Sequence, residues 1–262
     1  MPAVYRPLGV RGWWQVNPAS GPAVLALVDE SSEDQLAPAD AQVTALGWLA
    51  ERGLGPRPCA APALGATAPP TPGPGPAAWA QARWYSRLAG WPADGPENQI
   101  QGSGLLEGLG RAVRRLHDLP ADASVPMVQL EDLLSEVGAR VAAGVVDREN
   151  FAPARRRVEP QRLVDQLHAL LPILERRRPV EPVLTHGGCQ LGAVWLERTE
   201  PTGFIGVQRL AVADPYRDLG AMARSLAGFF GAEALPGFFA AYGLSAPDPI
   251  RLEFYALLDE LL

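Results

Sequence analysis

Lysine is absent from this sequence of 262 residues, so every one of its 23 basic side chains is an arginine. No lysine ammonium can therefore hold a nucleotide phosphate at any position of the chain. Cysteine is limited to Cys59 and Cys189. Two distant cysteines form no disulfide framework, and with three histidines at unrelated spacings they indicate no zinc site. The simplest compartment for such a chain is the reducing cytoplasm.

Long hydrophobic runs and a basic charge balance are missing too. The longest apolar runs, such as Ala23–Val28, are far too short to span a bilayer, and no secretory leader is visible. The formal net charge of −6 opposes nucleic-acid binding, which usually needs a basic surface, and it would suit a cationic ligand. We therefore expect no membrane and no nucleic acid as partner, but a cationic small molecule or another protein.

The composition, 47% hydrophobic and 20% charged, is that of a folded globular domain. The first third of the chain is predicted to be β-rich with one helix, and many prolines between residues 53 and 77 limit strand formation there. The predicted elements are strands at 12–16, 23–29 and 78–86, a helix at 39–52 and a short edge strand near 59–64.

The remainder is predicted to be mainly helical, because apolar residues recur at helical spacing. The predicted helices are 103–117, 131–144, 160–177, 217–230, 233–242 and 249–262. Two short strands, 193–196 and 203–207, interrupt this pattern and are predicted to be joined by a hairpin loop at 200–202.

The stretch from Val183 to Leu219 carries the most specific pattern, VLTHGGCQLGAVWLERTEPTGFIGVQRLAVADPYRDL. It resembles the catalytic and metal-binding segment of the aminoglycoside 3′-phosphotransferases, kinase-fold enzymes of antibiotic resistance. That family has THGD, four residues and Asn, and later GFIDxGRLxVAD, three residues and Asp. The matching residues are Thr185, His186, Gly187, Gly203, Phe204, Ile205, Arg209, Leu210, Val212, Ala213, Asp214 and Asp218.

The resemblance implies an α+β, two-lobed, protein-kinase-like fold. We expect a small β-rich N-terminal lobe with one helix at residues 1–86 and a larger, mainly helical C-terminal lobe at residues 87–262. The second lobe would carry the segment 183–219. In this second lobe, the resemblance implies structural roles for two residues. His117 would end a helix, and Asp218 would brace the catalytic loop.

The positions that carry the chemistry do not match. The family's catalytic-base aspartate falls on Gly188, its metal-binding asparagine on Ala193 and its second metal-binding aspartate on Gly206. Mg²⁺ needs hard oxygen ligands, and none of these residues has a side-chain oxygen. We therefore expect no intact catalytic site and no metal ligand.

The nucleotide-holding pair is missing as well. The family's phosphate lysine falls on Val28, and the glutamate that pairs with it in kinase folds falls on Gln42. Loss of both partners avoids leaving one charge unpaired. ATP and Mg²⁺ are expected for the family, but no cofactor is predicted for this chain.

The resemblance also points to residues that contact the antibiotic. The family's terminal Asp-Glu and last residue match Asp259, Glu260 and Leu262, and Arg209 matches an arginine near the same site. Two acids of the loop 145–154, Asp147 and Glu149, lie in a segment that helps to cover the antibiotic. The alternative is an exposed acidic helix end and a solvated loop, with no ligand.

Three functional hypotheses follow. The first is an aminoglycoside phosphotransferase-like protein that is catalytically inactive, a pseudokinase with a binding or scaffold role. The second is an active ATP-dependent small-molecule phosphotransferase with an unconventional site. The third is a structural or interaction protein that binds no small ligand. Because a fold does not fix a function, all three remain open at this point.

Overall fold

The computed structural model describes residues 3–8, 10, 12–18, 20–28, 39–63, 79, 82–96 and 103–262. Two compact units divide the chain. The first comprises residues 1–105 and 191–208, and the second comprises residues 106–190 and 209–262. The lobe boundary expected after residue 86 stays a prediction.

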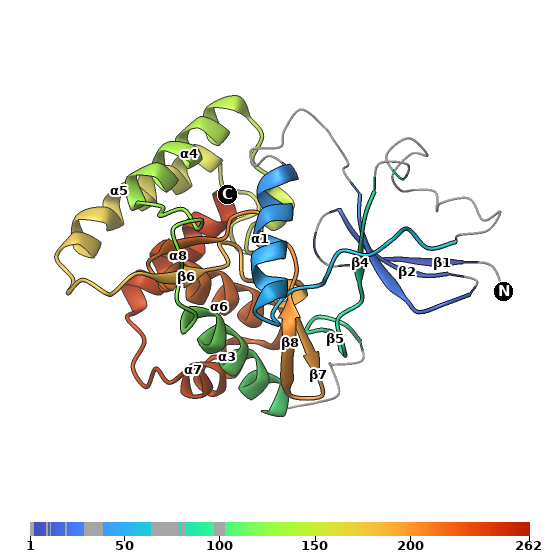
Figure 1. Cartoon of the computed structure of the whole chain (residues 1–262). Coiled ribbons are helices and arrows are strands. Elements are labelled where there is room, and N and C mark those ends of the chain that lie inside the picture. The colour runs from blue at the N-terminus through green and yellow to red at the C-terminus, as the bar shows by residue number, and fades with distance from the viewer. Residues whose placement is uncertain are drawn as a thin grey trace. The chain divides into compact units, whose positions relative to one another are not determined.

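The first unit contains an antiparallel sheet with the strand order β1-β2-β3-β4 (Figure 1). Its elements are β1 (Val4–Pro7), β2 (Trp13–Asn17), β3 (Val24–Leu27), helix α1 (Ala39–Glu51) and β4 (Arg83–Ser86). An apolar cluster from β2 and β3, including Trp14, Val16 and Val24, packs against Trp79. Because Val16 pairs with Val24, alternate residues of both strands point into this cluster.

A second, three-stranded sheet in the first unit has the order β5-β7-β8. Its strands are β5 (Trp91–Pro92), β7 (Val194–Glu197) and β8 (Glu200–Phe204), and the short 3₁₀ helix η2 (Leu191–Ala193) precedes β7. The hairpin loop expected at 200–202 is wrong. Glu197 pairs with Glu200, so the turn consists of Arg198 and Thr199, and Arg198 adopts a positive φ of 59°.

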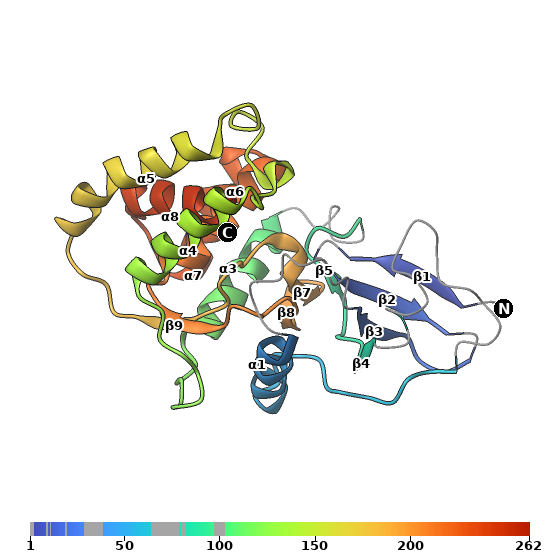
Figure 2. The ribbon, with the colours of Figure 1, turned by 90° about the horizontal axis from the view of Figure 1, so that it is seen from above.

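The second unit is built mainly of helices around α8, which packs against α4, α5 and α6 (Figure 2). Its helices are most of α3 (Ser103–His117), then α4 (Leu130–Ala143), α5 (Pro160–Glu175), α6 (Tyr216–Phe230), α7 (Leu235–Tyr242), α8 (Pro249–Leu261) and the 3₁₀ turns η1 (Arg148–Asn150) and η3 (Ala232–Ala234). The helices predicted from apolar spacing are confirmed, with ends that differ by one or two residues.

Local capping sets the ends of these helices. The Asp248 carboxylate accepts hydrogen bonds from the Ile250 and Arg251 amides at 2.9 and 3.3 Å, and Pro249 occupies the first turn of α8. Helix α4 ends at Gly144, whose φ of 71° is a left-handed conformation that glycine adopts without strain.

Two short strands, β6 (Val183–Thr185) and β9 (Ala211–Ala213), pair antiparallel in the second unit. Each contains three residues, too few for a period to be recognised in the sequence. Residues 186–190 follow directly after β6, and residues 214–218 follow directly after β9.

Two further expectations are only partly met. Near residues 59–64 the described residues contain an isolated bridge between Pro58 and Tyr85 rather than a strand, since prolines remove ladder donors. The strand expected at 78–86 is formed at Arg83–Ser86, and part of the expected range lies outside the described residues. Within the described part of the chain, no helix has the length and hydrophobicity that crossing a bilayer would require.

Candidate functional site

The loop His186–Gln190 follows β6 and is held by one buried carboxylate. Asp218, in the first turn of α6, accepts hydrogen bonds from the His186 amide at 2.6 Å and from the Gly187 amide at 2.8 Å. Its side chain is fully buried. Asp218 therefore fixes the backbone of the loop, which confirms the structural role expected for it.

A histidine and a tyrosine extend this brace. His117 Nε2 lies 3.1 Å from Asp218 Oδ2, and His117 Nδ1 lies 2.8 Å from the Tyr242 hydroxyl. Burial opposes ionisation of Asp218, but the His117 hydrogen bond, the nearby imidazoles and the Gly187 amide outweigh it and lower the pKa of Asp218. Burial raises the pKa of Tyr242 to about 12, so this phenol stays protonated. His117 is thus a packed residue, as expected.

The loop has little freedom at Gly187. Its φ is +86°, and a β-carbon there would lie 2.4 Å from the Arg209 carbonyl oxygen. The Arg217 guanidinium, itself buried, donates to the same carbonyl at 3.1 Å and to the Thr185 hydroxyl at 3.2 Å. Only glycine fits position 187, which explains why a close-packed loop carries it.

Gly188 differs from its neighbour. Its φ lies outside the left-handed region, and a β-carbon built there would meet no described heavy atom within 4 Å. The adjacent Cys189 is fully buried, and burial together with the charges of Asp218 and Asp259 raises the pKa of its thiol well above the usual value. The position expected for a catalytic base therefore has room for a side chain but has none, and the neighbouring thiol stays protonated.

The two positions expected for metal ligands lie together in the first unit. The Ile205 amide donates to the Ala193 carbonyl at 3.0 Å, so Ala193 and Gly206 stand at the same end of the hairpin β7–β8. Gly206 has a φ of +74°, and a β-carbon there would lie 2.7 Å from Val10 Cγ1. A side chain at this position would therefore be strained and would press against Val10.

The positions expected for the phosphate lysine and its glutamate are also in the first unit. Val28 is 1% exposed and belongs to the apolar cluster of Trp14 and Trp79, and its amide donates to the Gly12 carbonyl at 2.8 Å. Gln42 is half-buried on α1. Val28 thus contributes to the core of the unit, where an ammonium would be costly to bury.

In the second unit, the C-terminal turn of α8 contacts the loop His186–Gln190. The Gln190 amide nitrogen Nε2 donates to Asp259 Oδ2 at 3.3 Å, and the Gln190 backbone amide donates to the Gly188 carbonyl at 2.9 Å. Arg224 of α6 donates from Nε to the same Asp259 oxygen at 3.0 Å and from Nη1 to the Asn150 carbonyl at 2.6 Å. Asp259 is therefore already paired with a guanidinium.

Glu260 is paired in the same way. Its side chain is 0% exposed, and Arg155 Nη2 lies 2.7 Å from its Oε1 while Arg155 Nη1 donates to Glu253 Oε1 at 3.0 Å. The hydrogen bond to Glu260 raises the pKa of Arg155. A cationic ligand could reach Glu260 only by displacing this arginine.

The remaining expected ligand residues lie around the same region. Arg209 forms an ion pair with Glu136 of α4. Asp147 caps η1 by accepting from the Glu149 amide at 2.9 Å, and Leu262 is half-buried at the end of α8. The structure therefore gathers Gly188, Asp259 and their neighbours in the second unit.

A pocket of about 700 Å³ is lined by Arg155 and Arg224, the arginines that pair with Glu260 and Asp259. It is formed by the segment 149–156 and by facing sides of α6 and α8. Glu149 and Glu253 line it together with Arg155, Arg156 and Arg224. Its charges are mixed, so it is not a purely anionic site for a polycation.

Sequence reasoning missed the arginines that neutralise the acids. Arg155, Arg224 and the acid Glu136 come from segments far from their partners in the chain, and no spacing rule links them. The arginine triplet 155–157 was one visible signal, but it gave no indication that one of its members reaches a buried glutamate.

The residues do not fit a Mg²⁺-bound nucleotide. Ala193 and Gly206 offer no side-chain oxygen, Val28 is buried in an apolar cluster, and Asp218 is used by the brace. Among the described residues, no three His, Cys, Asp or Glu side chains are grouped so that they could hold a metal ion. What the described residues retain is a loop held by Asp218 and a pocket beside η1.

Comparison with known proteins identifies the family. The chain belongs to the phosphotransferase enzyme family, whose sequence model matches residues 10–255. It is 32% identical over 158 residues to an aminoglycoside 3′-phosphotransferase of Escherichia coli, which covers 60% of this chain and 56% of that protein. It is 34% identical over 158 residues to a streptomycin 3″-kinase of Streptomyces griseus, covering 57% of each. The matched part thus spans little more than half the length of these relatives.

Solved structures confirm the predicted kinase-like α+β fold. A type VIII aminoglycoside 3′-phosphotransferase matches 100% of this chain and 94% of its own, with a TM-score of 0.72 at 24% identity. An aminoglycoside phosphotransferase of Streptomyces rimosus, solved with ADP and streptomycin, matches 97% of this chain and 93% of its own, with a TM-score of 0.71 at 26% identity.

Proposed function

We propose that this chain is a catalytically inactive member of the phosphotransferase enzyme family with a binding or scaffold role. One observation carries the proposal: the loop His186–Gln190 is fully braced by Asp218, yet position 188 has neither a carboxylate nor any other side chain. The absence of side-chain oxygens at positions 193 and 206, and of lysine throughout the chain, supports it.

The expected loss of rate is large. A general base contributes on the order of 10²–10⁴-fold, and metal ions and a lysine stabilise the phosphates in addition. These effects are not additive, because groups that act as a unit fail together. Restoring one group should therefore restore little.

The test compares the wild-type chain with Gly188→Asp in a Mg·ATP phosphotransfer assay with kanamycin and streptomycin. A competent relative serves as the positive control. We expect no transfer by either form, because the variant still lacks metal ligands and lysine. Turnover by the wild-type chain at an ordinary kinase rate of about 1–100 s⁻¹ would overturn the proposal.

Binding of the family's nucleotide and antibiotics is tested by thermal shift. A ligand at 100 times its dissociation constant adds about 2.7 kcal/mol of stability to the protein it binds. We expect no Mg²⁺-dependent shift with ATP. With aminoglycosides we expect at most weak binding by the native chain, because Asp259 and Glu260 are already paired with Arg224 and Arg155. An ATP shift that needs Mg²⁺ would contradict the proposal.

The alternative is an active small-molecule phosphotransferase with an unconventional site. Membership of an enzyme family and two retained carboxylates, Asp214 and Asp218, favour it. Both carboxylates are engaged, however: Asp214 by Arg251 at 2.6 Å and Asp218 by the brace.

We also infer a reducing cytoplasm as the compartment, since both cysteines, one exposed and one buried, are free thiols.

A further inference from the structure

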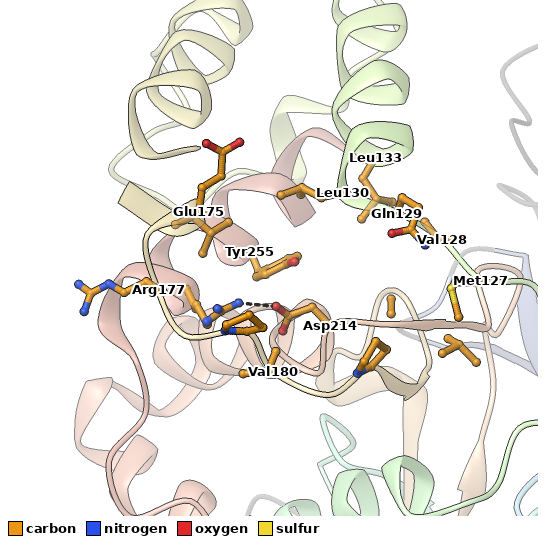
Figure 3. Close-up of a pocket in the computed structure, with 16 residues that line it drawn as sticks. Met127, Val128, Gln129, Leu130, Leu133, Glu175, Arg177, Val180, Asp214 and Tyr255 are labelled. Carbon is orange, nitrogen blue, oxygen red and sulfur yellow. Dashed lines mark hydrogen bonds and ion pairs between the residues drawn. The ribbon is translucent and has the colours of Figure 1, made fainter. Parts of the chain in front are cut away.

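A second cavity in the helical unit lies outside the candidate site and has a different character. It measures about 300 Å³ and is formed by the segment preceding α4, the end of α5 with the residues that follow it, the end of β9 and one face of α8 (Figure 3). None of the residues of the loop His186–Gln190 or of the last turn of α8 lines it.

Most of the cavity wall is apolar. Leu130 and Leu133 of α4 lie on one side and Val180 on another, and Met127 stands at the edge, where it is 61% exposed (Figure 3). A large exposed methionine beside an apolar cavity is a flexible contact surface. Pockets that bind small molecules combine such walls with a few placed polar groups.

The polar groups are concentrated at one point. Asp214 Oδ2 accepts from Arg251 Nη1 at 2.6 Å, Asp214 Oδ1 accepts from the Tyr216 amide at 2.8 Å, and Tyr255 lines the cavity beside them. Figure 3 shows Asp214 and its ion pair at the centre of the cavity, with the Tyr255 ring beside them. The arrangement places a neutral ion pair and a phenol against an apolar space.

Hydrogen-bonding capacity remains in this group. A carboxylate has about four acceptor sites, and the Tyr216 amide and Arg251 occupy two of those on Asp214. Burial and the Asp214 charge raise the pKa of Tyr255, so its hydroxyl stays protonated and can donate. One ligand hydroxyl could therefore donate to Asp214 and accept from the Tyr255 hydroxyl.

The charges lining the cavity cancel. Glu175 and Arg177 at its rim are opposite in sign, as are Asp214 and Arg251. A charged ligand would lose its hydration without gaining a net counter-charge. The cavity volume of about 300 Å³ is at the lower end of the range of ligand pockets, which favours a small ligand.

We propose that this cavity is a binding site for a small, uncharged, mainly apolar molecule that carries one hydroxyl group, such as a cyclic or aromatic alcohol. The ligand body contacts the leucine and valine walls, and its hydroxyl bonds to the Asp214–Tyr255 group. The proposal is independent of catalytic inactivity, because the cavity shares no lining residue with the braced loop.

The test uses 2-naphthol as probe, with naphthalene, 2-naphthoate and a naphthylmethylammonium salt as comparisons. Binding is measured by saturation-transfer NMR and calorimetry on the full chain. We expect 2-naphthol to bind at least tenfold more tightly than either charged analogue. Equal binding of the charged analogues, or no binding at millimolar concentration, would overturn the proposal.

Two variants locate the probe. Val180→Trp fills the cavity and should abolish binding, whereas the control Ile173→Trp, on an exposed part of α5 outside the lining, should not. Leu130→Trp replaces the first variant if that one does not fold. Tyr255→Phe should weaken 2-naphthol about tenfold and leave naphthalene unchanged, corresponding to one lost hydrogen bond. Unchanged binding in a filled, folded variant would place the probe elsewhere and refute the site.

Discussion

The positions that carry the chemistry in the resembling family have changed in different ways in the two units. In the second unit, Gly188 sits in a loop that Asp218 still braces, and the space beside it is open. In the first unit, Val28 is part of a hydrophobic core, and Gly206 adopts a backbone conformation that strains most residues with a side chain. Position 188 lacks only a side chain, whereas positions 28 and 206 are constrained by packing and by backbone conformation.

This difference has an energetic reason. Asp218 accepts buried backbone hydrogen bonds, and leaving such donors unsatisfied is costly. A catalytic side chain usually contributes little to stability and can be lost without that penalty. The brace therefore contributes to the stability of the fold, whereas a substitution at position 188 leaves no buried donor unsatisfied.

The largest effect is expected when the brace is removed. Asp218→Ala leaves the His186 and Gly187 amides and His117 without their acceptor in a fully buried site. We expect a loss of about 3–5 kcal/mol in the free energy of unfolding, measured by urea denaturation. Asp165→Ala, at an exposed position on α5, is the control and should change it by less than about 0.5 kcal/mol. Similar small effects for both would show that the brace is not structural.

The next largest effect concerns the first unit. Val28→Lys places an ammonium in the cluster of Trp14 and Trp79, and the long side chain can relieve only part of the cost by reaching toward water. We expect about 2–3 kcal/mol of destabilisation. Ala41→Lys on the exposed side of α1 controls for the added charge. A neutral effect at position 28 would mean that the lysine position is still available there.

The two glycines provide the matched comparison. Gly206→Ala should cost about 1–2 kcal/mol, because its φ is +74° and the new β-carbon would lie against Val10. Gly188→Ala should change the free energy of unfolding by no more than about 0.5 kcal/mol, because nothing described lies within 4 Å of the new β-carbon. Equal costs at both positions would remove the distinction drawn between the two units.

The smallest effect is a pH dependence. Because the pKa of Asp218 is lowered on folding, its stabilising contribution is complete above the ordinary aspartate pKa of about 4 and is lost as the pH falls further. The wild-type chain should therefore lose stability below about pH 4 more steeply than Asp218→Asn, by at most about 1.4 kcal/mol per pH unit for one proton. Parallel curves for the two proteins would refute the lowered pKa.

The sequence predicted most of the fold because long helices carry a readable period. Helix α3 was expected at its observed bounds, with Leu109, Val113 and Leu116 on its buried side. The pair β6 and β9 was missed because three residues show no period, and the turn at Arg198–Thr199 was expected two residues later, at 200–202. Local patterns do not determine where a short strand begins.

The candidate site was predictable in part. The motif around His186 placed the loop and indicated that Asp218 is structural, and the hydrogen bonds confirm that role. The pairing of Glu260 with Arg155 was not predictable, because it joins residues more than a hundred positions apart. The conformation of Gly206 was equally hidden, since its φ depends on the hairpin around it.

One measurement tests catalytic inactivity most directly. The protein is mixed, in excess over streptomycin or kanamycin, with saturating Mg·ATP, and the antibiotic is followed by mass spectrometry for an added phosphoryl group. A kinase working at about 1 s⁻¹ would convert all of the antibiotic within seconds. We expect no conversion after an hour, with either the native chain or Gly188→Asp. Conversion of the antibiotic by the native chain would contradict the account, because the loss of the polar groups at positions 188, 193 and 206 would then not have removed the chemistry.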